Sequence, residues 1–339
     1  MVNGNLYTMK ETNTNTWISV SIFYDNLDKL IVEAVLPFSN NLSSKAIVKR
    51  HFFDRRRERG EHLMLALELE NLQNLKIVKE EIEKIFSPFL NQNPGKVKEF
   101  QLPILDWFIP YPNGHVRLNN NFSLDVMETG GVQATKVYEN ILSISSQLVL
   151  DLVQDEGWNS DSAIAIGFQV HLAFLNSFKT DLGEIKIIYD QLMTDTLQVS
   201  IGDNQNTKDE LLAGLEENFL AQKDGLVEYI SYVLESTKNQ EEELDEWLLG
   251  FMKNLNEEFK LLTAIQINQD FEPIENFKMN MAFPCSIERQ RLWPFIAQCL
   301  KTINRQLGIV DVFEFNQIYF LKRSVHELIN ENEEKLTEA

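Results

Sequence analysis

The first third of the chain alternates apolar and polar side chains over several short stretches. Residues 17–24 alternate with the period of two that is typical of a strand with one buried face. Residues 62–69 carry leucine at every second position, and an aromatic pair lies within residues 51–55. These two segments flank a turn centred on Arg59-Gly60, so we predict a β-hairpin here.

Apolar residues at spacings of three and four predict helices over 26–35, ended by Pro37, and over 72–90, ended by the Asn-Pro-Gly at 93–95. Short strands are expected at 97–102 and 115–118. From Gly131 onward the pattern is helical, with helices predicted over 132–153, 160–179, 182–197, 208–220, 226–237, 241–262, 286–306 and 312–328. The glutamates at 241–243 are expected in the first turn of their helix, where the helix dipole favours negative charge.

This order of elements predicts an α+β fold, with an N-terminal, mostly antiparallel sheet and its covering helices followed by a helical C-terminal lobe. We divide the chain into a flexible N-terminus (1–15), an α+β lobe (16–130), a helical lobe (131–330) and a polar tail (331–339). With 339 residues, 44% of them hydrophobic and 22 of them Phe, the chain can fill a substantial core.

The formal net charge of −20 argues against binding to nucleic acid or to an anionic membrane as a property of the whole surface. Cations nevertheless concentrate around the predicted hairpin, at Lys49, Arg50, Arg55, Arg56, Arg57 and Arg59. Arginine binds carboxylates bidentately, so this patch is a candidate site for a carboxylate or an acidic stretch of a peptide. The alternative is a solvated strand edge on which positive charge discourages aggregation.

Several classes of protein are disfavoured by what the sequence lacks. Cys285 and Cys299 are too few for a disulfide framework, and the five histidines lack metal-ligand spacing. Nucleotide-binding, zinc-protease and serine-hydrolase motifs are absent, so we expect neither cofactor nor metal. No signal peptide and no long apolar run is present, which favours a cytoplasmic location.

Three blocks of sequence carry a resemblance to a known family. Residues 52–55 (F-F-D-R), Gly60 and residues 62–65 (H-L-M-L) resemble the pattern F-F-[IDV]-R-x-x-x-x-x-G-x-H-L-x-L. That pattern begins the C-terminal, SpaB-type domain of lantibiotic dehydratases, which also occurs as free-standing thiopeptide-type bacteriocin biosynthesis proteins. Residues 126–131 (V-M-E-T-G-G) and 303–308 (I-N-R-Q-L-G) are similar to two later blocks of the same family, V-E-R-Y-G-G and H-M-x-x-N-R-L-x-G.

The resemblance implies an elimination reaction, but this chain lacks several residues that the family uses for it. Family members that eliminate glutamate act on Ser or Thr side chains esterified by glutamate, and their arginines and histidine suit stabilisation of the departing acid and proton transfer. The family positions are occupied here by other residues: Met64, Ala66 and Glu128 replace arginines, Thr129 replaces a tyrosine, Leu300 replaces the histidine and Lys301 the methionine. We therefore expect a peptide groove bordered by inert side chains, without the elimination machinery.

The candidate peptide-binding residues are Arg55, Arg57, His62, Asn304 and Arg305, while the catalytic residues are unknown. Arg55, His62, Asn304 and Arg305 match family positions. His62 beside Gly60 has a structural alternative as a hydrogen-bonded group, and Arg305 has one as a cap of helix carbonyls. His171, within a strongly apolar segment, is expected to be a core or interhelical histidine.

We expect the protein to bind a leader-bearing precursor peptide in a cleft between the basic hairpin and the helix around Asn304-Arg305. Our leading hypothesis is a lyase or ring-closing enzyme that joins two dehydroalanines into a six-membered nitrogen ring. A non-catalytic partner subunit of a separate lantibiotic dehydratase is the alternative, and a homodimer is left open. An unrelated helical binding protein is a third interpretation, and it would lack a sheet in the first 120 residues.

Overall fold

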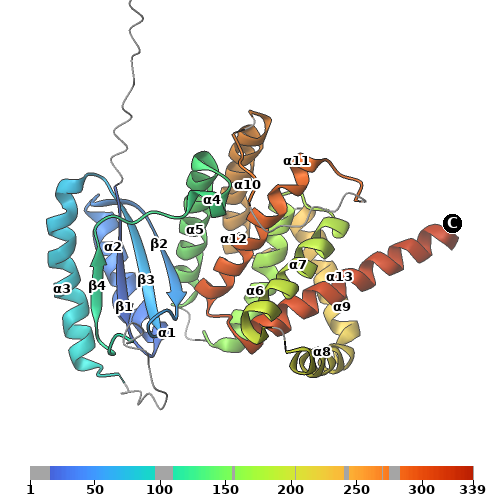
Figure 1. Cartoon of the computed structure of the whole chain (residues 1–339), viewed down its shortest axis with the longest axis horizontal. Coiled ribbons are helices and arrows are strands. Elements are labelled where there is room, and N and C mark those ends of the chain that lie inside the picture. Colours follow the sequence, from blue (N-terminus) through green and yellow to red (C-terminus); the bar gives the residue numbers. More distant parts are fainter. Residues whose placement is uncertain are drawn as a thin grey trace, which may run out of the picture.

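The computed structural model describes residues 16–95, 110–154, 157–202, 204–239, 244–268, 270–274 and 283–338. A small sheet with its own helices forms one end of the molecule, and a group of helices forms the other (Figure 1). The predicted α+β fold is confirmed, and an unrelated all-helical protein is excluded. The expected flexible N-terminus (1–15) and the strand expected at 97–102 lie outside the described residues.

The sheet has four antiparallel strands, β1 (Trp17–Phe23), β2 (Val48–Arg56), β3 (His62–Leu69) and β4 (Val116–Asn119), in the order β2-β3-β1-β4. The predicted hairpin is β2 and β3. Arg59 and Gly60 form its turn, with φ angles of 62° and 117°. Glycine adopts a φ of 117° readily because it has no Cβ atom, which explains why position 60 is glycine.

The chain between β1 and β2 is helical to Ser44, so the prediction that Pro37 ends the helix is wrong. Helix α1 (Leu27–Leu30) continues through a π-helical turn (Ile31–Val35) into α2 (Leu36–Ser44). Pro37 lies in the first turn of α2, directly after the wide π turn. A proline is tolerated at that place, since its missing N–H follows a turn that already departs from the regular hydrogen-bond ladder.

A short 3-10 turn (Leu72–Asn74) precedes helix α3 (Leu75–Gln92). Helix α3 packs with α1 and α2 on one side of the sheet (Figure 1). The rings of Phe38 on α2 and Phe86 on α3 pack with centroids 5.0 Å apart. Strand β1 presents Ile18, Val20 and Ile22 on one face, all fully buried. The predicted period of two thus places one continuous apolar face of the sheet in the core.

The remaining helices are α4 (Val126–Thr129), α5 (Val132–Leu152), α6 (Ser160–Ser177), α7 (Leu182–Ile201), α8 (Gln205–Leu220), α9 (Lys223–Asn239), α10 (Glu246–Ile267), α11 (Ile287–Gln290), α12 (Leu292–Leu307) and α13 (Val312–Glu338). Helix α10 begins at Glu246, later than predicted, and the glutamates at 241–243 lie outside the described residues. Helix α13 continues beyond Leu328 to Glu338, because its last residues, although polar, are mostly good helix formers.

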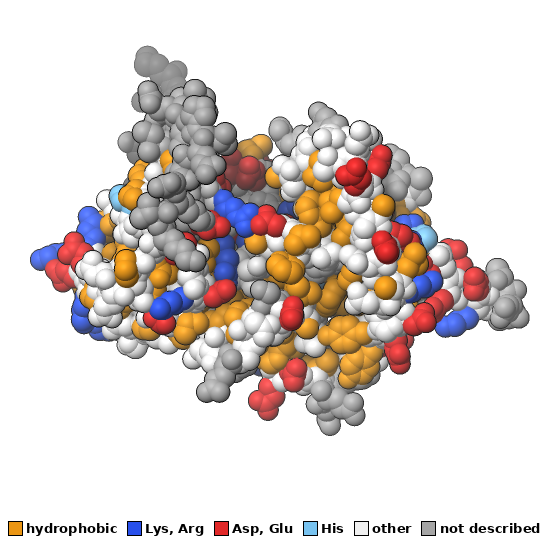
Figure 2. All heavy atoms as spheres, turned by 90° about the horizontal axis from the view of Figure 1, so that it is seen from below, with side chains coloured by type: hydrophobic (Ala, Val, Ile, Leu, Met, Phe, Trp, Pro, Cys, Tyr) orange, Lys and Arg blue, Asp and Glu red, His pale blue; other side chains and the backbone are white. Residues whose placement is uncertain are grey.

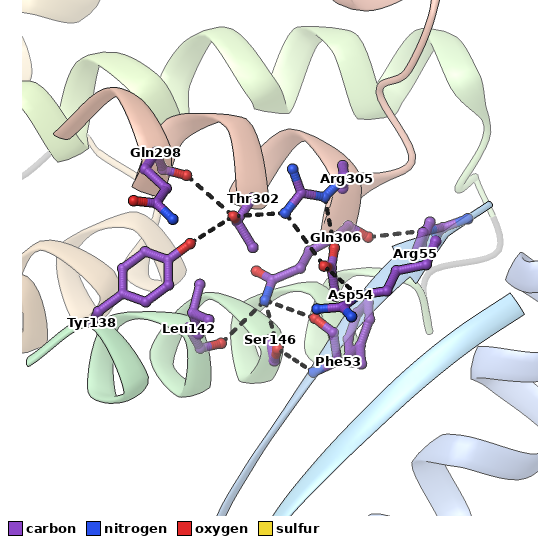
Figure 3. Close-up of polar contacts among 11 residues, drawn as sticks. Phe53, Asp54, Arg55, Tyr138, Leu142, Ser146, Gln298, Thr302, Arg305 and Gln306 are labelled. Atoms are coloured by element: carbon purple, nitrogen blue, oxygen red, sulfur yellow. Dashed lines mark hydrogen bonds and ion pairs between the residues drawn. The ribbon is translucent and has the colours of Figure 1, made fainter. Parts of the chain in front are cut away.

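Strand β2 is an edge of the sheet, but helices α5 and α12 cover it. The Phe53 backbone N–H donates to Ser146 Oγ on α5 at 3.0 Å. The Gln306 side-chain amide on α12 donates to the Phe53 carbonyl and to Ser146 Oγ, both at 2.9 Å (Figure 3). Backbone groups that would be unpaired on a bare edge are therefore satisfied by side chains, and the sheet is joined to the helices.

Replacing Gln306 tests how much this junction contributes. Gln306→Leu removes the donor to Phe53 and Ser146 inside a fully buried contact. We expect the free energy of unfolding, measured by urea denaturation, to fall by about 1–3 kcal/mol because buried acceptors lose their partner. Gln147→Leu on the exposed face of α5 is the matched control and should change it by less than about 0.5 kcal/mol. Equal effects of the two substitutions would contradict the proposed junction.

None of the helices in the described ranges combines the length and the apolar character that a lipid bilayer requires of a spanning segment. No cluster of three or more His, Cys, Asp or Glu side chains is placed there to hold a metal ion.

Candidate functional site

A groove of about 1000 Å³ lies between the sheet and the helices, and we call it the interlobe groove. Its walls come from the β1–α1 connection, the end of β2 with the hairpin turn, the ends of α7 and α12, and the start of α13. This is where a cleft between the hairpin and the late helix was expected. In the view from below, cationic and acidic side chains lie together in the hollow between the two parts of the molecule (Figure 2).

Arg55 points from the end of β2 towards the end of α12. Its side chain is only 10% exposed and donates to Asp28 Oδ1 at 2.6 Å and to the Gln306 carbonyl at 3.3 Å. Gly308, with φ of 83°, lies so close to Arg55 that a Cβ added at the glycine would be 3.1 Å from the guanidinium carbon. The glycine that ends α12 thus makes room for Arg55, which links the two sides of the groove.

Asp54 is the buried anion of the groove, with 5% of its surface exposed. It accepts from Arg305 at 2.7 and 3.3 Å and from Arg56 Nε at 3.1 Å (Figure 3). Arg305 also donates to Thr302 Oγ1, which is bonded to the Tyr138 hydroxyl at 2.9 Å. Burial raises the pKa of Tyr138 well above its ordinary value, so this hydroxyl stays protonated.

Arg57, in the hairpin connection, forms a bidentate pair with Asp311, which precedes α13. Both nitrogen–oxygen distances are 2.6 Å, and the two side chains are 54% and 62% exposed. The hydrogen bond from Arg57 lowers the pKa of the Asp311 carboxyl, although water screens the pair. This pair closes one side of the groove and is accessible to a ligand.

The arginines are therefore not the free basic patch that the sequence suggested. Arg55, Arg56, Arg57 and Arg305 are each paired with an aspartate from the groove itself. The charged residues lining the groove are Lys29, Arg55, Arg56, Arg57 and Arg305 on the positive side, and Asp25, Asp28, Asp54, Glu58, Glu61, Asp311 and Glu314 on the negative side. A bound carboxylate must compete with these aspartates for the arginines.

Of the five predicted binding residues, the structure brings Arg55, Arg57 and Arg305 together at the groove. His62 and Asn304 are buried, at 6% and 1% exposure, and lie behind the groove wall. His62 is bonded to the Gly60 carbonyl at 2.9 Å and stacks on Phe23, which is a structural role. Asn304 is bonded to His171, which is fully buried among the helices as expected from its apolar segment.

The positions where the family motifs are replaced do not border this groove. Met64, Ala66 and Leu300 are buried, Glu128 is exposed on α4, and none of them lines the cavity. The expectation of a groove bordered by inert side chains is wrong for this cavity, because arginines from the end of β2 and from α12 line it instead.

Glu314 was not singled out from the sequence. It lies in the first turn of α13, half-buried in the groove wall. Burial raises the pKa of its carboxyl, while Lys301, Arg305 and a hydrogen bond from Asn304 act in the opposite direction. No motif could have revealed it, because the groups around it become neighbours only through the turn that joins α12 to α13.

The family model described as "Lantibiotic biosynthesis dehydratase C-term" matches residues 17–325. Among solved structures, a pyridine synthase, TbtD, from thiomuracin biosynthesis is similar with a TM-score of 0.70 and 13% identity, covering 92% of this chain and 98% of that one. TsrL is similar with a TM-score of 0.63 and 13% identity, covering 93% of this chain and 95% of that one.

The tRNA dependent lantibiotic dehydratase MibB from Microbispora sp. 107891 is similar with a TM-score of 0.60 and 13% identity. That match covers 96% of this chain but 29% of the dehydratase, so this chain spans less than a third of its length. A comparison with curated proteins finds no match. At 13% identity, these TM-scores show that the three proteins share the fold of this chain.

Proposed function

Because the chain belongs to the family of lantibiotic biosynthesis dehydratase C-terminal domains, we propose that it acts in the biosynthesis of a ribosomally made, modified peptide. The precursor peptide would bind in the interlobe groove. The observation that carries this proposal is the groove itself, whose volume of about 1000 Å³ suits a peptide segment and whose walls include parts of two family blocks, at Arg55 and at Arg305.

The reaction that we propose is ring closure or another lyase-type step on a dehydrated precursor. The match covers 98% of a pyridine synthase, so this chain has a counterpart for nearly all of that enzyme's fold. Such a reaction depends strongly on holding two distant parts of one peptide together, since proximity alone lowers the barrier substantially. A groove between two parts of the protein can supply that positioning.

A second candidate is a partner subunit that assists a separate dehydratase without chemistry of its own. The match to 29% of a lantibiotic dehydratase favours it, because the chain corresponds in size to one part of a larger enzyme. Under this proposal the groove would still bind the precursor peptide, and the protein would act only in the presence of the dehydratase.

Mass spectrometry of the precursor peptide distinguishes these proposals. The purified protein is mixed with the dehydrated and, separately, with the glutamylated precursor encoded near its gene. We expect conversion of the dehydrated peptide by the protein alone. Conversion only after a dehydratase is added would favour the partner role, and loss of glutamate would show that elimination survives without the replaced arginines.

Peptide binding is measured separately, by fluorescence anisotropy of the labelled precursor. Arg57→Glu places two carboxylates opposite each other at the groove, and we expect about a tenfold weaker affinity, or about 1.4 kcal/mol. Lys260→Glu, a charge reversal on α10 at a side chain that is 69% exposed, is the matched control and should bind like the unchanged protein. If the unchanged protein binds no precursor, the proposed function is wrong.

A further inference from the structure

Asp54 is shared by two arginines, which distinguishes it from the other paired aspartates of the interlobe groove. Arg305 Nε donates to Asp54 Oδ1 at 2.7 Å, and Arg56 Nε donates to Asp54 Oδ2 at 3.1 Å. Arg305 Nη2 lies 3.3 Å from Oδ2 and also donates to Thr302 Oγ1 at 2.9 Å (Figure 3). One buried carboxylate therefore holds two guanidinium groups in place.

The positive and negative charges at Asp54 do not balance. Arg55 is paired with Asp28, so that pair contains one cation and one anion. The pair of Arg57 and Asp311 is balanced in the same way. At Asp54 two cations meet one anion. Because arginine stays charged at every working pH, one positive charge remains without an anion of its own.

The hydrogen bonds to Asp54 use only part of each arginine. Arg56 is held through Nε, and its Nη1 and Nη2 are the pair of nitrogens that can bind a carboxylate bidentately. Arg305 is held through Nε and Nη2. Within the part of the chain that the structure describes, no hydrogen bond engages Nη1 and Nη2 of Arg56 or Nη1 of Arg305. Both side chains are partly exposed and line the groove, so a ligand can reach them.

The simpler interpretation is that these ion pairs only join the sheet to the helices. This interpretation explains Arg305, because Arg305 connects α12 to β2 through Asp54. It does not explain Arg56, which lies two residues from Asp54 on the same strand, so that their pair joins no separate elements. A second cation beside an aspartate that is already paired adds repulsion between the two arginines. A second anion relieves that repulsion.

The groove as a whole does not attract free anions. Seven acidic and five basic side chains line it, and the chain has a formal net charge of −20. A small anion therefore gains little by entering the groove. A carboxylate that belongs to a peptide is brought to the two arginines by the other contacts of that peptide. The ligand that suits both the local cations and the acidic surroundings is therefore a peptide carboxylate.

We propose that Arg56 and Arg305, held by Asp54, form a receptor for one carboxylate of the precursor peptide. This proposal rests on the proposed function. The carboxylate is either that of an Asp or Glu side chain or that of the peptide C-terminus. Arg56 binds it through Nη1 and Nη2, and Arg305 contributes Nη1. Charge-assisted, bidentate hydrogen bonds of this kind fix both the position and the orientation of the peptide in the groove.

Three labelled peptides test the receptor by fluorescence anisotropy. They are the precursor, a version with Asn and Gln in place of every Asp and Glu, and a version with an amidated C-terminus. We expect the unchanged protein to bind one of the two neutralised versions about tenfold more weakly than the precursor, as for the loss of one charge-assisted hydrogen bond. The version that loses affinity identifies the source of the carboxylate.

Arg56→Gln should remove this difference, because it keeps a polar side chain and takes away the charged guanidinium group. The variant should bind the precursor about tenfold more weakly than the unchanged protein does, and it should bind that neutralised version with unchanged affinity. Arg291→Gln, an exposed position at the opposite end of α12 from the groove, is the matched control and should keep the full preference for the precursor.

Equal affinity of the unchanged protein for all three peptides overturns the inference, leaves the proposed function intact and requires no variant to fold. Equal weakening of all three peptides by Arg56→Gln also overturns it, because the arginines then bind a neutral acceptor such as a main-chain carbonyl. If Arg57→Gln removes the preference and Arg56→Gln does not, the carboxylate binds at Arg57 and the inference is wrong. Absence of binding of every peptide overturns the proposed function itself.

Discussion

Asp54→Ala should lower the free energy of unfolding by about 2–3 kcal/mol. Asp54 is buried and accepts hydrogen bonds from both Arg305 and Arg56. The substitution removes charge-assisted hydrogen bonds from the guanidinium groups of Arg305 and Arg56, whose side chains are 37% and 34% exposed, so water replaces the carboxylate only in part. Here one deletion leaves Arg305, which links α12 to the sheet, without its anion. Equilibrium denaturation in urea at pH 7 measures the effect.

Asp311→Ala is the matched control for this prediction. Asp311 also accepts a bidentate hydrogen bond from an arginine of the β2–β3 hairpin, but both partners are more than half exposed. Exposed pairs contribute at most about 1 kcal/mol, because water screens them and replaces them. If the two substitutions destabilise the protein equally, burial is not what makes the Asp54 cluster important.

Acidification from pH 6.5 to 4 should destabilise the protein by about 3 kcal/mol through His171 alone. Burial lowers the pKa of His171 from 6.5 to about 4. Between these values the unfolded chain holds a proton on this histidine and the folded chain does not, so protons favour unfolding. The stability is therefore present above pH 6.5 and is lost as the pH falls towards 4. Burial lowers the pKa of His51 in the same way, also to about 4.

Comparison with His171→Gln isolates this contribution. Glutamine carries no proton at either pH, and every other titrating group is common to the two proteins. The difference in unfolding free energy between pH 7 and pH 4.5 should therefore be smaller in the variant by about 2 kcal/mol or more. Identical pH dependence in the two proteins would mean that His171 is not held neutral in the folded state.

Much of the fold follows from local pattern. The β2–β3 hairpin was predicted from leucines at every second position and a turn with Gly60, since the period of two and a positive φ are properties of a few adjacent residues. The helices from α5 to α13 were predicted from their 3.6-residue period, except that the one helix expected over 286–306 is divided at Arg291 into α11 and α12. Their ends were less predictable. Pro37 did not end a helix, because a π turn before it accommodates proline.

The site could be predicted only in part. Arg55, Arg57 and Arg305 were identified because they are charged residues in or beside recognisable blocks. Their partners were not identified, because Asp28 and Asp311 belong to segments with no motif of their own. A basic run in the sequence looked like an open anion site, whereas most of its cations are paired. Arg55 and Arg57 pair with the distant Asp28 and Asp311, Arg56 with the neighbouring Asp54, and Lys49 and Arg50 with Glu68.

By itself the sequence determined the strands and most of the helices, the acidic surface and the family, since these depend on periodicity, charge and short blocks of adjacent residues. Only the tertiary structure decided which side chains meet. It placed Asp54 under Arg305, buried Asn304 against His171, and brought Glu314 into the groove wall. These contacts join residues more than a hundred positions apart, and packing of helices against a sheet edge sets them, which no local pattern encodes.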